Sequence, residues 1–159
     1  MSAGPLKVCI QHPTEVDLDR LHASWASVQR AVDVEHHPFR ESIALRRTRV
    51  RGALPQDLDD KLKAAIPVPS QALVRSWAEA EVLVTLDLGV EHLAQMPNLR
   101  WVQAYSAGIE QFPVDEMARR GIRLTTAAGA GAPAIAEFVI GRLIEVARNT
   151  RAIEEMQRA

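Results

Sequence analysis

Apolar residues occur in two patterns along this chain: short runs rich in β-branched residues, and stretches with an apolar residue every three or four positions. The short runs indicate buried strands and the wider spacing indicates amphipathic helices. The expected strands cover residues 6–11, 31–34, 81–86, 100–105 and 122–126. The expected helices cover residues 14–25, 56–65, 70–80, 90–96, 113–120 and 132–159.

The order of these segments indicates the fold class. Strands and helices alternate with short links from residue 6 to residue 126, which is the sequence form of right-handed βαβ units. Residues 81–86 are almost wholly apolar, as expected for a parallel strand covered on both faces. We therefore expect an α/β fold with an open parallel sheet and helices on both faces.

The last 28 residues form the longest stretch of helical pattern. They contain one glycine, Gly141, no proline after Pro133, and apolar residues at helical intervals as far as Met156. A single helix over 132–159 would extend about 42 Å, more than a domain of this size covers with its own sheet. Part of this helix is therefore expected to contact another domain or subunit.

Composition excludes several classes of partner. The chain has 159 residues, 47% of them hydrophobic, and a formal net charge of −1, so no strong field attracts nucleic acid. The one cysteine, Cys9, forms neither an intrachain disulfide nor a zinc-binding pair. No apolar run approaches the roughly 20 residues that cross a bilayer. We expect a cytoplasmic protein that binds neither nucleic acid nor membranes.

One local cluster of positive charge stands out, formed by Arg46, Arg47, Arg49 and Arg51. It is compatible with anion binding. Charges beside a turn at Gly52 are more typical of a solvated edge, and we favour that interpretation.

Residues 129–134, Gly-Ala-Gly-Ala-Pro-Ala, match a relaxed dinucleotide-binding fingerprint, because they follow a strand and open a helix. A dinucleotide-binding unit also requires a second strand that ends in an acidic residue about 20 positions further on. Here the helical pattern continues instead. We interpret these residues as a small-residue turn that leads into the helix.

Residues 104–108, Ala-Tyr-Ser-Ala-Gly, resemble the nucleophile elbow of serine hydrolases and place Ser106 at the end of a strand. In that fold the catalytic histidine follows the serine. Here all five histidines precede it: His12, His22, His36, His37 and His92. The adjacent pair His36–His37 would point to opposite faces of a strand, so we expect surface residues rather than a shared metal site.

Five segments, in order and in spacing, resemble the first domain of the D-isomer-specific 2-hydroxyacid dehydrogenases. They are AEVLV at 80–84, MPNLRWVQ at 96–103, YSAGIE at 105–110, GIRLT at 121–125 and IAEF at 135–138. The resemblance covers residues 80–150 closely. Before Ala80 it is weak, and residues 46–69 look like an expansion.

The resemblance implies an oxidoreductase that interconverts 2-hydroxy and 2-keto acids with NAD or NADP, commonly as a homodimer. Residues 1–131 would form a flavodoxin-like substrate domain and residues 132–159 a connecting and dimerisation helix. In the family a Rossmann domain, absent from this chain, binds the cofactor and carries the catalytic arginine, glutamate and histidine. We therefore expect no catalytic residue and no metal here, and no activity from the chain alone.

Two sets of site residues follow from the resemblance. Ser106, Ala107 and Gly108 would bind the substrate carboxylate through backbone N–H groups, and Ile135 would line the cofactor cleft. Two alternatives stay open: a stand-alone flavodoxin-like binding or dimerisation module, and a serine hydrolase at Ser106.

Overall fold

The computed structural model describes residues 4–25, 27–41, 43–50, 58–64 and 66–158. The chain divides into two compact units, residues 1–127 and residues 128–159. The first unit contains a five-stranded sheet with its helices, and the second contains two helices.

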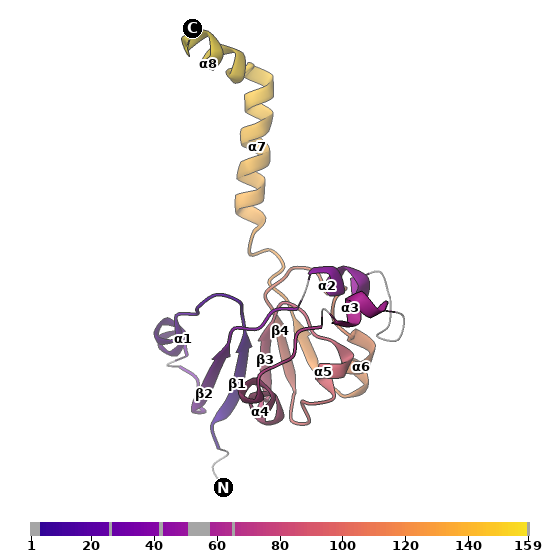
Figure 1. The fold of residues 1–159 in the computed structure, drawn as a ribbon. Helices are drawn as coiled ribbons and strands as arrows, with labels where there is room; N and C mark the ends of the chain where they lie inside the picture. The colour runs from indigo at the N-terminus through magenta and orange to yellow at the C-terminus, as the bar shows by residue number, and fades with distance from the viewer. Residues whose placement is uncertain (1–3, 26, 42, 51–57, 65, 159) are drawn as a thin grey trace. The chain divides into compact units, whose positions relative to one another are not determined.

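The sheet of the first unit is wholly parallel, with strand order β2-β1-β3-β4-β5 (Figure 1). Its strands are β1 (Leu6–Gln11), β2 (Val32–His37), β3 (Val82–Thr85), β4 (Trp101–Ala104) and β5 (Arg123–Thr125). All five expected strands are present, and the expected open parallel sheet is confirmed. The strand order changes direction between β1 and β3, and sheets of this kind bind ligands outside the carboxyl ends of the strands at that point.

Four expected helices of this unit are present: α1 (Leu18–Ser24), α4 (Gln71–Glu79), α5 (Val90–Leu93) and α6 (Val114–Arg119). Capping side chains explain where two of them begin. Asp17 accepts a hydrogen bond from the N–H of Arg20 at 2.9 Å, and the Ser70 hydroxyl accepts one from the N–H of Leu73 at 3.1 Å. Each bond satisfies a donor that the helix leaves unpaired.

The region between β2 and α4 differs from the expectation. No helix was expected around Arg46 and Arg47, but residues 43–50 form helix α2 (Ile43–Val50), whose Leu45 is buried while Arg47 is exposed. Helix α3 (Asp60–Ala64) lies within the expected helix over 56–65, of which residues 56, 57 and 65 lie outside the described part of the chain. Arg51 and the side chain of Arg49 also lie outside it.

Alternate strand residues fill the core on the two faces of the sheet. On one face Cys9, Leu83 and Val102 are buried in a cluster with Trp77 of α4 and Met117 of α6. On the other face Val8, Ile10 and Val82 are buried, and Leu18 and Leu21 of α1 pack against them. Helices therefore cover both faces, as expected.

The second unit contains α7 (Ala132–Arg148) and α8 (Thr150–Arg158). The expected long helix begins at Ala132, but its expected continuity to residue 159 is wrong. Asn149 takes a left-handed conformation, with φ of 50°, and ends α7. Asparagine adopts that conformation more readily than most residues. Among the described residues, no helix combines the length and apolar character needed to span a membrane.

The buried position of Cys9 leads to a prediction about its reactivity. Burial raises the pKa of the Cys9 thiol to about 11, and the side chain is fully buried. Because the thiolate is the reactive form, we expect the folded chain to resist iodoacetamide at pH 8 and to react once it is unfolded in urea. Mass spectrometry of the labelled chain measures both states. Rapid labelling of the folded chain would contradict this burial.

Candidate functional site

The loop formed by Ser106, Ala107 and Gly108 lies at the carboxyl edge of the sheet, directly after β4 and Tyr105. The N–H of Tyr105 donates to Thr85 O at 3.1 Å, which continues the pairing with β3. The N–H of Ala127 donates to Ser106 O at 3.0 Å and ties the loop to the segment after β5. The loop thus occupies the edge at which open α/β sheets bind ligands.

The buried side chain of Gln111 anchors this loop through hydrogen bonds. Its amide nitrogen Nε2 donates to Leu86 O at 2.9 Å and to Ser106 Oγ at 2.8 Å. The Ser106 hydroxyl in turn donates to Gly108 O at 2.9 Å. The hydroxyl hydrogen is therefore directed at a carbonyl group, and this arrangement does not support a serine nucleophile.

Two backbone N–H groups of the loop are unpaired among the described residues. Between described residues, no hydrogen bond uses the N–H of Ala107 or Gly108 as its donor. A Cβ atom added at Gly108 would collide with the Glu110 carboxylate, whereas the φ angle of Gly108 is not in the left-handed region. The missing side chain at Gly108 thus leaves room for the Glu110 carboxylate, and no unusual backbone angle calls for glycine here.

Charges of both signs act on Tyr105 at the same edge. The pKa of Tyr105 is raised, mainly because its side chain is half-buried. The negative charge of Asp87 raises this pKa further. The positive charges of Arg40 and Arg46 lower it. The phenol therefore stays neutral at physiological pH. Arg40, before α2, and Arg46, within it, thus act on Tyr105 against the larger effect of Asp87.

The glycine-rich turn and Ile135 belong to the second unit. Gly129 has φ of 85°, which favours glycine, and Gly131 precedes the first residue of α7. The segment leads into α7 and α8, with no strand after it among the described residues. These features agree with a turn. Ile135 lies in the first turns of α7 and is 65% exposed.

The histidine pair on β2 does not share a ligand. His36 Nε2 lies 3.0 Å from the backbone oxygen of His12, and His37 Nε2 lies 3.2 Å from Glu35 Oε2. Both side chains are partly buried, so the expectation of plain surface residues is only partly right. They line a groove of about 390 Å³ beside α4, which does not include the loop at residues 106–108.

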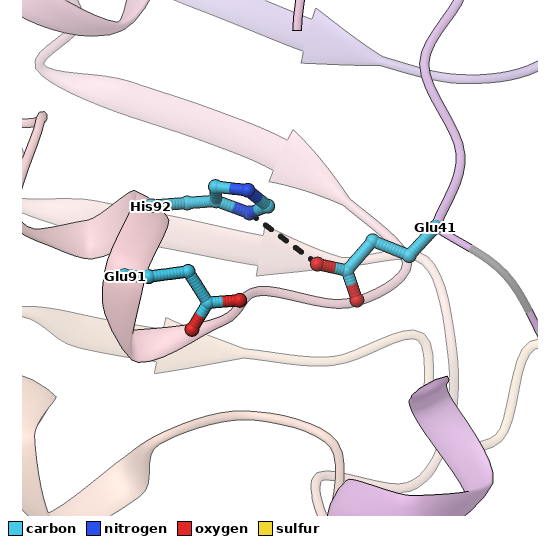
Figure 2. Close-up of side chains that lie close together, drawn as sticks. All are labelled: Glu41, Glu91 and His92. Carbon is cyan, nitrogen blue, oxygen red and sulfur yellow. Dashed lines mark ion pairs between the residues drawn. The ribbon is translucent and has the colours of Figure 1, made fainter. Parts of the chain in front are cut away.

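A cluster of Glu41, Glu91 and His92, in which Glu41 and His92 are buried and Glu91 is partly buried, was not foreseen (Figure 2). His92 Nδ1 lies 3.3 Å from Glu41 Oε1, and both side chains are almost fully buried. The ring of His92 also packs against Trp77, with 4.9 Å between ring centroids. One ligand atom from each residue lies within 4.8 Å of the others, a spacing compatible with a cation.

The position of this cluster favours a structural role. Glu41 lies just before α2, whereas His92 belongs to α5. The ion pair therefore connects the segment before α2 to α5. No single sequence motif signals the pair, because its two members come from distant segments. The carboxylate of Glu41 and the imidazole of His92 are almost fully buried, so neither is exposed to solvent.

Comparison with known structures supports the fold. The D-lactate dehydrogenase of Treponema pallidum aligns with 95% of this chain and 39% of its own, at 17% identity and a TM-score of 0.57. The D-mandelate dehydrogenase of Rhodotorula graminis aligns with 97% of this chain and 40% of its own, at 14% identity and a TM-score of 0.58. A D-lactate dehydrogenase from Aquifex aeolicus, complexed with NAD and lactic acid, gives a TM-score of 0.54 at 13% identity over 95% of this chain and 37% of its own.

Comparison of sequences points to the same group. A glyoxylate reductase from Thermofilum pendens is 29% identical over 85 residues, which are 52% of this chain and 25% of that enzyme. The chain therefore spans a quarter of that relative and about two fifths of the aligned structures. The profile of the catalytic domain of D-isomer specific 2-hydroxyacid dehydrogenases matches residues 45–158, which extends the resemblance upstream of Ala80. With well over half of its residues in that match, the chain belongs to the D-isomer specific 2-hydroxyacid dehydrogenase family.

Proposed function

We propose that this chain forms the substrate-binding part of an NAD(P)-dependent oxidoreductase that interconverts 2-hydroxy and 2-keto acids. The observation that carries the proposal is the loop of Ser106, Ala107 and Gly108, which leaves backbone N–H groups open at the carboxyl edge of a sheet of this family. Successive N–H groups of this kind form concave sites for anions. The anion in question is the carboxylate of the substrate.

The residues of this chain bind and orient the substrate. Gln111 fixes Ser106 through its amide, and the N–H groups of Ala107 and Gly108 then hold one end of the acid. Holding the carboxylate in one place presents the adjacent carbonyl carbon in a defined orientation, which is the protein's main contribution to hydride transfer.

The nicotinamide cofactor supplies the hydride when it is bound. The described residues do not fit a dinucleotide site, because the turn at Gly129 and Gly131 leads only into helices. We therefore assign cofactor binding to residues outside this chain. Ile135, exposed and apolar in the first turns of α7, is proposed to line the cofactor cleft.

One experiment separates these claims. The purified 159-residue chain is titrated with glyoxylate and, separately, with NADH and NADPH, and it is then assayed for oxidation of either cofactor. We expect binding of the keto acid, no binding of either dinucleotide and no turnover, because the aligned relatives are far longer than this chain. Turnover by the chain alone would contradict the assignment of the cofactor to other residues.

We further propose that α7 lies at an interface between two copies of the chain. The helix exposes apolar side chains in every turn, which is unusual for a solvated helix. They include Ile135, Phe138, Val139, Ile140, Leu143, Ile144 and Val146. A symmetric homodimer is the simplest arrangement that would cover such a surface.

Sedimentation velocity at micromolar concentration tests this interface. We expect a dimer for the unmodified chain and a monomer for Leu143→Glu, since a charge in the centre of an apolar interface is strongly unfavourable. Val68→Glu is the matched control, because Val68 is 90% exposed but lies outside α7. A monomeric unmodified chain would contradict the interface. A dimer that binds no keto acid would instead indicate a stand-alone dimerisation module.

A further inference from the structure

His12 lies directly after β1, beside the point where the strand order changes direction. Its ring packs against that of Tyr105, with 4.8 Å between centroids and 58° between planes. Tyr105 immediately precedes the loop of Ser106, Ala107 and Gly108. The imidazole therefore adjoins the proposed carboxylate site, although it comes from a different strand.

Neighbouring groups fix both the backbone and the ring of His12. His36 Nε2 lies 3.0 Å from His12 O, close enough to donate a hydrogen bond to that carbonyl. Thr14 contacts the ring nitrogen Nδ1 through its N–H, at 3.2 Å, its hydroxyl, at 2.8 Å, and its carbonyl oxygen, at 3.1 Å. With Nδ1 as acceptor the N–H and the hydroxyl can both donate to it, whereas a hydrogen on Nδ1 would leave the N–H facing another donor. The acceptor form satisfies more of these groups, and it places the hydrogen of the neutral imidazole on Nε2.

The Nε2–H group has no hydrogen-bond partner among the described residues, and His12 is only partly buried. The ring therefore presents a donor of fixed orientation at the ligand-binding edge of the sheet.

We propose that His12 is a specificity-determining residue whose Nε2–H donates a hydrogen bond to an oxygen on C3 of the 2-keto acid. The carboxylate at C1 lies in the loop at residues 106–108, and the ring beside Tyr105 is placed to meet the other end of the acid. This inference rests on the proposed function of that loop. It assigns to the site a preference for acids with an oxygenated C3 over acids with a plain methyl group.

Two substitutions at His12 test the two ring nitrogens separately. The Asn side chain in His12→Asn places an oxygen near the position of Nδ1 and keeps the acceptor for Thr14, but it has no group at the position of Nε2. The Gln side chain in His12→Gln carries its amide N–H near the position of Nε2. If His12 only stabilised the turn to Thr14, His12→Asn would leave the binding of both acids unchanged.

Binding of hydroxypyruvate and pyruvate compares substrates that differ only by the C3 hydroxyl. With the unmodified chain we expect hydroxypyruvate to bind about two- to tenfold more tightly, the range that one neutral hydrogen bond provides. His12→Asn is expected to abolish that preference while leaving the dissociation constant of pyruvate within about twofold. His12→Gln is expected to retain part of the preference. His22→Asn is the control at an exposed histidine.

The outcomes separate the two proposals. Equal binding of the two acids by the unmodified chain, or an unchanged preference in His12→Asn, would overturn the role of His12 alone. Failure of either acid to perturb the amides of residues 106–108 would overturn the proposed function and the role of His12 together. Nitrogen-15 spectra of the ring add an independent check: a hydrogen on Nε2 is expected, and a hydrogen on Nδ1 in the neutral ring would overturn the proposal.

Discussion

Replacing His92 by alanine is expected to lower the free energy of unfolding by about 3 to 5 kcal/mol, the usual cost of removing one member of a buried ion pair. His92 Nδ1 lies 3.3 Å from Glu41 Oε1, and the two side chains are 6% and 2% exposed. The substitution also removes the ring that packs against Trp77 and Phe39. Urea unfolding followed by tryptophan fluorescence measures the loss.

Two further variants identify the origin of the effect. His22→Ala, at an exposed position on α1, is expected to change stability by less than about 0.5 kcal/mol. Glu41→Gln removes the charge but keeps the shape of the side chain. If the ion pair stabilises the fold, Glu41→Gln will cost less in the His92→Ala background than in the unmodified chain. A loss below about 1 kcal/mol for His92→Ala would contradict the buried pair.

Gly108→Val is expected to weaken the binding of glyoxylate at least about tenfold, which corresponds to the loss of one hydrogen bond to a charged group. The branched side chain would occupy the space through which the carboxylate approaches the backbone. The fold should tolerate the change, because the atoms displaced belong to the flexible end of the Glu110 side chain. A dissociation constant from calorimetry, with a urea unfolding curve for each variant, separates binding from stability.

The control for this variant is Gly141→Ala on α7, where an added Cβ meets no neighbour. It should leave glyoxylate binding unchanged and stabilise the helix by up to about 1 kcal/mol. Unchanged binding by a well-folded Gly108→Val chain would mean that the loop does not receive the carboxylate.

The strands of the sheet were predictable because each carries its own apolar pattern. Residues 6–11 and 82–85 are read as strands from their β-branched and apolar side chains alone, and the alternation of strands with helices then indicates the parallel sheet. The loop after β4 was predictable for a related reason: the end of an apolar strand followed by small residues marks the ligand edge of such a sheet.

Other features depend on contacts that local patterns do not record. Helix α2 was missed because its arginines obscure a short apolar pattern of which Leu45 is the buried member. The end of α7 at Asn149 was missed because asparagine, unlike proline, is compatible with helix continuation as well as with a left-handed turn. The pairing of Glu41 with His92, and of His12 with Tyr105, joins distant segments and becomes visible only in the folded chain.

Amide chemical shifts of the isotopically labelled chain during a glyoxylate titration test the central claim most directly, because they show where the acid binds. We expect the N–H signals of Ser106, Ala107 and Gly108 to move together and to saturate with one dissociation constant. Shifts that cluster instead around the groove at His36 and His37, or no saturable shift at residues 106–108, would contradict the assignment of this loop as the carboxylate site.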